Sequence, residues 1–404
     1  MKIDEKAHLS YCSNTHPGKD WAETIQHLKH YLPQVKKQFS PDQAFGVGIR
    51  LSNTASEQLL EGESLSSFRR WLKEEGLYVF TCNGFPYGEF HGQSVKDQVH
   101  HPDWTTPERL NYSLRLLYLM GALVPTGEEG SISTSPITYR HWYQEKEWPT
   151  VQKKAAEALA LWIEEAALLE EQTGTYIHLD IEPEPDGLLE NSDEFLAFYQ
   201  DYLLPIACER FQTNGLDLAA AEARVKRYVT LCYDVCHFSL AYEEPPVTWE
   251  KMQEAGIGIG KVQLSSALKL RATESTQQDV LKALMVFQEP TYLHQVTQQK
   301  DNQVKTYSDI PDLLKENPQF EELRAHFHVP VFLEDYGLLQ STQDQLLALF
   351  DLMKKAKISH HFEVETYTWD VLPEALKTPL EESIVRELQW VRAQWPTLSV
   401  NSGS

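Results

Sequence analysis

The sequence predicts an α/β protein built as a (β/α)8 TIM barrel, on three observations. Short strand-like runs alternate with longer helical runs along almost the whole chain, a pattern typical of parallel βαβ units. Counted with the last one, the strand-like runs number eight, as in a closed barrel. Polar side chains of the kinds that bind metal ions end several of these runs, and no glycine-rich phosphate fingerprint follows the first. The third observation disfavours the alternative, an open doubly wound sheet.

The expected strands are short runs that either alternate in polarity or are largely apolar. They cover residues 8–14, 45–52, 77–83, 131–135, 176–182, 228–237, 259–265 and 362–368. Helices are expected over residues 21–35, 65–75, 106–123, 150–171, 192–211, 248–255 and 381–394. Thr106 and Pro107 mark a helix start, and Gly174 marks the end of the helix that begins at Thr150.

The segment 269–336 breaks this rhythm. It contains a helix over 276–287 and the run HFHVPVF, which begins at His326. We expect an insertion between the seventh and eighth strands, a two-stranded flap over the barrel mouth; alternatively, HFHVPVF is itself a barrel strand. Residues 1–398 are then a single barrel domain, and 399–404 are a disordered tail.

Composition restricts the class of protein and its compartment. Hydrophobic residues make up 42% and charged residues 24%, as in soluble enzymes. The net charge of −23 disfavours nucleic acid as a partner, although it permits a small anionic ligand. Five cysteines without a signal peptide fit a reduced, cytoplasmic compartment. No run reaches the length of about 18 apolar residues that spans a bilayer.

Polarity alternates along several of the expected strands. In the second strand, Val47 and Ile49 alternate with Gly48 and Arg50. Because a barrel strand is buried on both faces, we expect the apolar side to pack against the helices and the polar side to face the barrel axis.

Three carboxylates stand at the C-terminal ends of expected strands, namely Glu182, Asp234 and Glu365. Barrel enzymes place their active sites at this end. Carboxylates that share one axis repel each other unless a cation lies between them, so we expect a divalent ion there. The alternative is that Glu182 or Glu365 pairs with Arg50 or with a lysine.

The run YVTLCYDVCH places Asp234 and His237 three residues apart after a strand. If the chain turns there, both side chains converge over the strand end. A carboxylate oxygen and a neutral imidazole nitrogen suit zinc or manganese. Alternatively, Asp234 only caps the turn by binding its own backbone.

These residues resemble the metal site of the xylose-isomerase-like barrels, a superfamily of sugar isomerases, 3-epimerases and endonuclease IV. The resemblance rests on HLDIEPEP, DVCH and the glutamate of the last strand. It implies a manganese, zinc or magnesium ion held by Glu182, Asp234 and Glu365. A strand-seven histidine usually completes that set, and Gln263 stands in its place here. An amide oxygen can bind manganese or magnesium but is a weaker zinc ligand.

The insertion offers imidazoles that could replace this nitrogen donor. His326 and His328 are two residues apart, so in a strand they would share one face. We expect at least one of His294, His326 and His328 to lie over the barrel mouth, within reach of the metal or its ligand. The alternative is a flap histidine far from the axis.

The whole chain resembles the EboE family of metabolite traffic proteins. The matching runs are HLSYCSNTHPG, TCNGFPYGEFHG, KVQLSSAL, YLHQV, HFHVPVF and EVETYTWDVLP. The resemblance implies a bacterial, cytoplasmic barrel from an operon that also encodes a membrane prenyltransferase, a TatD-like hydrolase and a cyclitol-synthase-like protein. The set is associated with moving a secondary-metabolite precursor towards the periplasm. Such a protein would act with the prenyltransferase without being embedded in the membrane.

The first functional hypothesis is a metal-dependent isomerase or epimerase of a sugar, polyol or cyclitol. In the 3-epimerase relatives, the glutamates of strands five and eight move a proton next to a metal-polarised carbonyl, which implies Glu182 and Glu365 here. The residues expected to contact the substrate, a small-molecule metabolite, are His16, Asn83, His91, His237, His294, His326 and His328.

Two alternatives remain open from the sequence. An endonuclease IV-like phosphodiesterase is indicated by D-x-C-H followed by H-x-H, although the charge of −23 argues against DNA as substrate. A non-catalytic metabolite carrier or scaffold on the same barrel is favoured by Gln263. The sequence leaves the substrate and the oligomeric state open.

Overall fold

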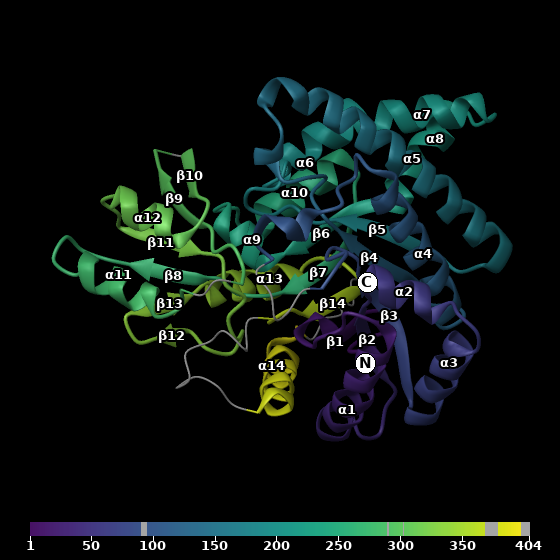
Figure 1. The fold of residues 1–404 in the computed structure, drawn as a ribbon, viewed down its shortest axis with the longest axis horizontal. Helices are drawn as coiled ribbons and strands as arrows, with labels where there is room; N and C mark the ends of the chain where they lie inside the picture. Colours follow the sequence, from purple (N-terminus) through teal and green to yellow (C-terminus); the bar gives the residue numbers. More distant parts are fainter. Residues whose placement is uncertain (90–94, 289–290, 302, 368–378, 397–404) are drawn as a thin grey trace, which may run out of the picture.

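Eight parallel strands form the central barrel of the computed structural model (Figure 1). The structure describes residues 1–89, 95–288, 291–301, 303–367 and 379–396. The strands follow the order β1-β14-β7-β6-β5-β4-β3-β2. A parallel bridge between Cys12 and Gly48 joins the two ends of this order. The sheet therefore closes on itself, which confirms the barrel and excludes the open doubly wound sheet.

All eight predicted strands are present, with bounds within a few residues of those expected. They are β1 (His8–Tyr11), β2 (Phe45–Arg50), β3 (Leu77–Asn83), β4 (Gly130–Thr134), β5 (Ile177–Ile181), β6 (Val229–Asp234), β7 (Ile259–Leu264) and β14 (His361–Val364).

Helices surround the barrel. They are α1 (Trp21–Phe39), α2 (Asn53–Leu59), α3 (Ser64–Glu75), α4 (Pro107–Leu123), α5 (Trp148–Thr173), α6 (Ser192–Phe198), α7 (Leu204–Thr213), α8 (Leu218–Tyr228), α9 (Val235–Leu240), α10 (Pro245–Ala255), α13 (Gln343–Met353) and α14 (Leu380–Gln394). A π-helical turn, η5 (Tyr199–Leu203), joins α6 to α7, and the 3-10 turns are η1 (Ser13–Thr15), η2 (Lys96–His100), η3 (Arg140–Trp142) and η4 (Glu145–Glu147).

Local signals set several of the helix ends. The Thr106 side chain accepts the Arg109 N–H at the start of α4, where Pro107 is the first residue. Gly174 ends α5 in the left-handed region, at φ 73°. The helices α2, α8, α9 and α13 were not predicted from the sequence. Of these, α2 and α9 are only 7 and 6 residues long, too short for a helical period to stand out.

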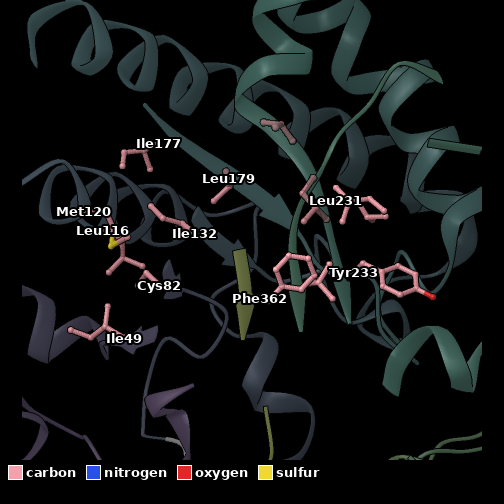
Figure 2. Close-up of a cluster of buried hydrophobic side chains, with 14 of the residues drawn as sticks. Ile49, Cys82, Leu116, Met120, Ile132, Ile177, Leu179, Leu231, Tyr233 and Phe362 are labelled. Carbon is pink, nitrogen blue, oxygen red and sulfur yellow. The ribbon is translucent and has the colours of Figure 1, made fainter. Parts of the chain in front are cut away.

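The main hydrophobic core lies between the strands and the helices. Figure 2 shows part of it, where Leu116 and Met120 of α4 lie near Cys82 of β3 and Ile132 of β4. Each fully buried side chain of this size contributes about 1.5–3 kcal/mol. The polar strand residues, such as Lys261, are buried on the other face, inside the barrel. This arrangement agrees with the predicted alternation.

The segment between β7 and α13 forms a second, antiparallel sheet of six strands in the order β10-β9-β11-β8-β13-β12. It comprises β8 (Leu268–Arg271), β9 (Val296–Lys300), β10 (Gln303–Tyr307), β11 (Glu322–Ala325), β12 (Asp335–Tyr336) and β13 (Leu339–Ser341), with helices α11 (Gln277–Met285) and α12 (Ile310–Glu316). The prediction of a two-stranded flap is therefore wrong. The sheet has a hydrophobic core of its own, which includes Leu284, Val296 and Leu323.

The run HFHVPVF is not a barrel strand. Residues 326–330 have no regular secondary structure. Backbone bonds hold this stretch between the two sheets, from the His326 N–H to the Gln295 carbonyl and from the Val329 N–H to the Ser266 carbonyl. Proline at 330 limits regular pairing here because it has no N–H. The division into one domain stays a prediction, and the predicted tail 399–404 lies outside the described residues.

None of the helices in the described ranges combines the length and the hydropathy needed to cross a bilayer.

Candidate metal centre

Three buried carboxylates converge at the C-terminal end of the barrel. Glu182 follows β5, Asp234 ends β6 and Glu365 follows β14. One oxygen from each lies within 4.8 Å of the others. The period-two alternation of the strands explains the convergence, because it directs these side chains to the barrel axis at the same level.

The two carboxylate oxygens of Asp234 differ in their hydrogen bonding. Oδ1 accepts the His237 N–H at 3.0 Å and the Ser265 hydroxyl at 2.8 Å. Asp234 therefore does cap α9, as the alternative interpretation expected. Oδ2 is buried and has no hydrogen-bond partner among the described residues. A buried carboxylate oxygen without a partner is costly, and a cation would stabilise it.

The electrostatics of the three carboxylates point the same way. Burial raises the pKa of Glu182 and Glu365 well above the usual range, and the neighbouring carboxylates, Asp234 among them, raise these pKa values further. Burial would also raise the pKa of Asp234. The nearby His237 and His328, together with the hydrogen bonds that Asp234 accepts, instead hold the pKa of Asp234 below its usual value. A divalent ion would let all three carboxylates ionise.

Three imidazoles converge beside the carboxylates. His237 Nε2 lies 3.1 Å from His326 Nε2 and 3.3 Å from His328 Nε2. A tetrahedral zinc ion at about 2.0–2.1 Å from each nitrogen would separate the nitrogens by about 3.4 Å. Each of these two distances is close to the nitrogen spacing at a zinc ion, and donor atoms of Asp234, His237 and His328 lie within 4.8 Å of one another.

The outer nitrogens of this cluster face hydrogen-bond acceptors. His326 Nδ1 lies 2.8 Å from Gln295 Oε1, and His328 Nδ1 lies 2.9 Å from the Glu365 carbonyl oxygen. These acceptors select the tautomer with the proton on Nδ1, which leaves the Nε2 lone pairs directed at His237. Burial lowers the pKa of His326 well below its usual value and that of His328 to about 4, so both rings are neutral at pH 7.

Several further residues position the site. Asn14 and Asn83 both donate through Nδ2 to Glu365 Oε1, at 2.7 and 2.9 Å. Glu184 Oε2 lies 3.9 Å from His237 Nε2, and Glu184 Oε1 lies 2.9 Å from His100 Nε2. Asn14, Glu184 and His100 were not among the predicted site residues. Glu184 had a signal, since it stands two residues after Glu182 in the EPEP run and alternation favours the same side.

Other predicted residues lie elsewhere. His16 Nε2 contacts the Tyr11 hydroxyl at 3.0 Å, and its ring stacks on Tyr31 of α1 at 4.2 Å. His294 stacks on Phe327 and contacts the His326 carbonyl through Nδ1, so it supports the 326–328 backbone. His91 lies outside the described residues.

Gln263 lies inside the barrel, and its amide oxygen accepts from Cys232 Sγ at 3.0 Å. Arg50 donates to the carbonyls of Gly18 and Gly88. Across the described ranges, no ion pair joins Glu182 or Glu365 to Arg50 or to a lysine. The two glutamates are thus available to a metal ion.

A cavity of about 60 Å³ opens onto these groups. Glu182, Glu365, His237 and His328 lie in its wall together with residues of the second sheet region such as Tyr292. The stretches just before β9 and just after β11 therefore supply part of the wall of the site. The unpartnered oxygen of Asp234 and the imidazole cluster both fit a divalent ion, so the residues present suit the metal that the sequence predicted.

Comparison with known proteins supports the fold. No protein-family model matches the chain, and no curated protein matches it in sequence. Among solved structures, a D-tagatose 3-epimerase-like protein is 10% identical with a TM-score of 0.50, covering 96% of both chains. A xylose-isomerase-like TIM barrel from Mycobacterium smegmatis in complex with magnesium has 11% identity, a TM-score of 0.48 and 96% coverage of both chains. The IOLI protein with a zinc atom has 14% identity and a TM-score of 0.43, over 96% of this chain and 99% of its own. At these identities the first similarity shows a shared fold, a TIM barrel.

Proposed function

We propose that this protein is a metal-dependent isomerase or epimerase of a small polyhydroxylated metabolite, a sugar or a cyclitol. The observation that carries the proposal is the pair of buried glutamates, Glu182 and Glu365, on either side of Asp234. The fold shared with the D-tagatose 3-epimerase-like protein supports it.

The two glutamates suit proton transfer. Burial and neighbouring charge raise their pKa values above the usual range for a carboxyl, the direction that favours proton uptake by a general base. Their strands, β5 and β14, are three apart in the barrel order, so the two groups reach a substrate from different sides. One glutamate removes the proton from the carbon next to a carbonyl, and the other returns a proton to the product. The ion, when bound, polarises that carbonyl.

The amides of Asn14 and Asn83 hold Glu365 in place through hydrogen bonds to one of its oxygens. Its other oxygen is then left to the metal or the substrate. Aromatic side chains in the cavity wall, Phe85, Tyr292 and Tyr367, exclude water from one side.

The runs shared with the EboE family support a narrower role within this proposal. The substrate would be a precursor of a secondary metabolite in a bacterial cytoplasm, and the protein would act alongside a membrane prenyltransferase. We also propose Glu182, Asp234, Gln263 and Glu365 as ligands of one ion, with His237, His326 and His328 as the ligands of a second.

The imidazole cluster favours a second candidate function, an endonuclease IV-like phosphodiester hydrolase. Two neighbouring ions can stabilise both the attacking and the leaving oxygen of a phosphate ester. The net charge of −23 opposes binding to a DNA backbone, so this candidate requires a small phosphodiester.

Exchange of a substrate proton with solvent tests the proposal. The protein, loaded with manganese or zinc, is incubated in D2O with a panel of ketoses and keto-cyclitols, and deuterium uptake next to the carbonyl is followed by NMR. We expect uptake with at least one compound, reduced about 100-fold or more in Glu182→Gln and Glu365→Gln. Glu250→Gln, an exposed change on α10, is the matched control and should keep wild-type exchange.

Two outcomes would overturn the proposal. Binding of a panel compound without exchange would indicate a carrier. Hydrolysis of bis(p-nitrophenyl) phosphate without exchange would indicate the phosphodiesterase.

A further inference from the structure

A second group of metal-binding side chains lies at the opposite end of the barrel. Glu129 immediately precedes β4, His178 is the second residue of β5, and His361 is the first residue of β14. Donor atoms of these three residues lie within 4.8 Å of one another. His178 lies on β5 and Glu182 directly follows this strand, four residues later, so about 13 Å separates this group from the candidate metal centre. We propose that Glu129, His178 and His361 bind a structural divalent cation of the zinc type at the N-terminal end of the barrel.

The ligand types fit such an ion. Two imidazoles and one carboxylate form a zinc-binding set that leaves one position for water. Burial alone would raise the pKa of Glu129, but His360, His361 and His178 lower it to about 2, so this carboxylate is ionised. Burial lowers the pKa of His178, but Asp180 and Glu129 raise it above its usual value, so a metal ion bound here would displace a proton from this ring.

A buried carboxylate orients His178. His178 Nδ1 lies 2.6 Å from Asp180 Oδ1, and Asp180 Oδ2 accepts the Ser131 hydroxyl at 2.6 Å. Metal-binding histidines commonly donate their second N–H to a carboxylate in this way, which fixes the tautomer and raises the basicity of the free nitrogen. A Cβ at residue 260 would lie 2.1 Å from Asp180 Oδ1 and 2.6 Å from His178 Nδ1. Gly260 therefore leaves the room that this carboxylate–imidazole pair occupies.

His361 has an acceptor at each ring nitrogen. Nδ1 lies 3.2 Å from the Gly260 carbonyl oxygen, and Nε2 lies 3.2 Å from the Glu129 carbonyl oxygen. Burial lowers the pKa of this ring to about 3, so the ring is neutral and carries a single N–H. One nitrogen must then direct a lone pair at a carbonyl oxygen inside the protein. A cation near that nitrogen would convert an unfavourable contact into a coordinated one.

The group can be reached from solvent. Glu129 is about one-third exposed, at 31% of its side chain. Glu129 and His178 also line a groove of about 580 Å³ beside Gly260. An ion bound here would tie the start of β14 to the starts of β4 and β5, three or more positions away in the barrel order. Its role would be to brace the barrel end, since active sites of this fold lie at the other end.

Anomalous diffraction at the zinc edge tests the proposal on the unmodified protein. Crystals grown with zinc should show a peak among Glu129, His178 and His361, about 2.0–2.2 Å from the donor atoms. A peak only at the carboxylates of the barrel mouth, or at neither end, would overturn it.

Cobalt absorption in solution gives an independent test that does not depend on the proposed function. The chain carrying Asp234→Asn and His237→Ala, which removes one ligand of each ion proposed at the barrel mouth, should still bind about one cobalt ion with the visible bands of a low-coordinate site. Adding Glu129→Gln should weaken this binding about 10-fold or more. Adding Glu128→Gln, a matched change at the neighbouring glutamate that instead pairs with Lys2, should leave it unchanged. Equal effects of the two glutamine variants, or no cobalt binding in the starting chain, would contradict the proposal.

Discussion

Lys261 Nζ lies 2.5 Å from Glu363 Oε2, and both side chains are 0% exposed inside the barrel. The pair occupies β7 and β14, two residues before Gln263 and Glu365, and therefore lies directly beneath the candidate metal centre. The lysine charge lowers the pKa values of Glu182 and Glu365, in opposition to burial, which raises them. The lysine charge thus offsets part of the repulsion among the carboxylates, and its partner Glu363 counteracts it by raising the same two pKa values.

Replacing Lys261 with methionine should destabilise the protein. The change leaves Glu363 buried without its counter-ion, at a cost of about 3–5 kcal/mol. Urea denaturation followed by circular dichroism measures the free energy of unfolding. The double variant Lys261→Met with Glu363→Gln should recover most of the loss, because no buried charge then remains. A single variant as stable as the wild type would show that the pair contributes nothing to stability.

Gly48 should tolerate no side chain. A Cβ at this position would lie 1.5 Å from Glu363 Oε1 and 2.9 Å from the Tyr11 carbonyl oxygen. Gly48→Ala should therefore lower stability by about 1–3 kcal/mol or more, as overpacking of a core does. Gly88→Ala is the control, since a Cβ there meets no atom within 4 Å. Thermal denaturation measures the melting temperature of both variants. Equal melting temperatures for Gly48→Ala and Gly88→Ala would contradict the prediction.

Gln295 should strengthen metal binding without touching the metal. Its Oε1 accepts from His326 Nδ1 at 2.8 Å and so directs the other ring nitrogen to the imidazole cluster. Loss of such a supporting contact typically costs about 10–100-fold in metal affinity. We expect this loss in Gln295→Leu, measured by zinc titration against a chromophoric chelator. Gln298 lies on β9, and its side-chain Nε2 donates to the Gln319 carbonyl oxygen. The Gln298→Leu variant is the control and should bind zinc as the wild type does.

Stability should fall with rising pH because of Glu387. Burial raises the pKa of this carboxyl from 4.5 to about 8, even though hydrogen bonds from Thr366 and from the Val331 N–H lower it. Between these values the folded chain holds a proton that the unfolded chain has lost, so stability is present below about pH 4.5 and is lost as the pH rises through about 8.

The pH dependence can be isolated with a neutral substitute. Glu387→Gln should gain stability relative to the wild type between about pH 5 and pH 9, by a few kcal/mol at most. Denaturant unfolding at several pH values measures the difference. Glu382→Gln, an exposed change on the same helix, should follow the wild type. A constant difference between Glu387→Gln and the wild type across this range would refute the assignment.

The sequence by itself determined the barrel and the level of its carboxylates. Alternation at period two is a local property, and parallel strands that end at one level bring their last side chains together. Glu182, Asp234 and Glu365 could therefore be placed on one axis without knowledge of any long-range contact. The three lie together in the structure.

The second sheet could not be predicted from the sequence. Its strands pair antiparallel with partners far along the chain, as β8 does with β11 and β13. Short polar runs such as 296–300 and 303–307 carry weak local signals. What makes them strands is burial of their apolar members in a shared core, which depends on the partner and not on propensity.

The imidazole cluster, too, could be predicted only in part from the sequence. His237 could be placed at a strand end, but its contact with His328 joins positions 91 apart in the chain. The irregular backbone of 326–330 and the tautomers set by Gln295 and the Glu365 carbonyl decide where the Nε2 atoms point. Residue types and local periods specify which side chains can bind a metal. Only the tertiary packing that holds residues 292–295 and 326–328 in the wall of the site determines which of them meet, because the free energy that fixes their positions comes from contacts between distant segments.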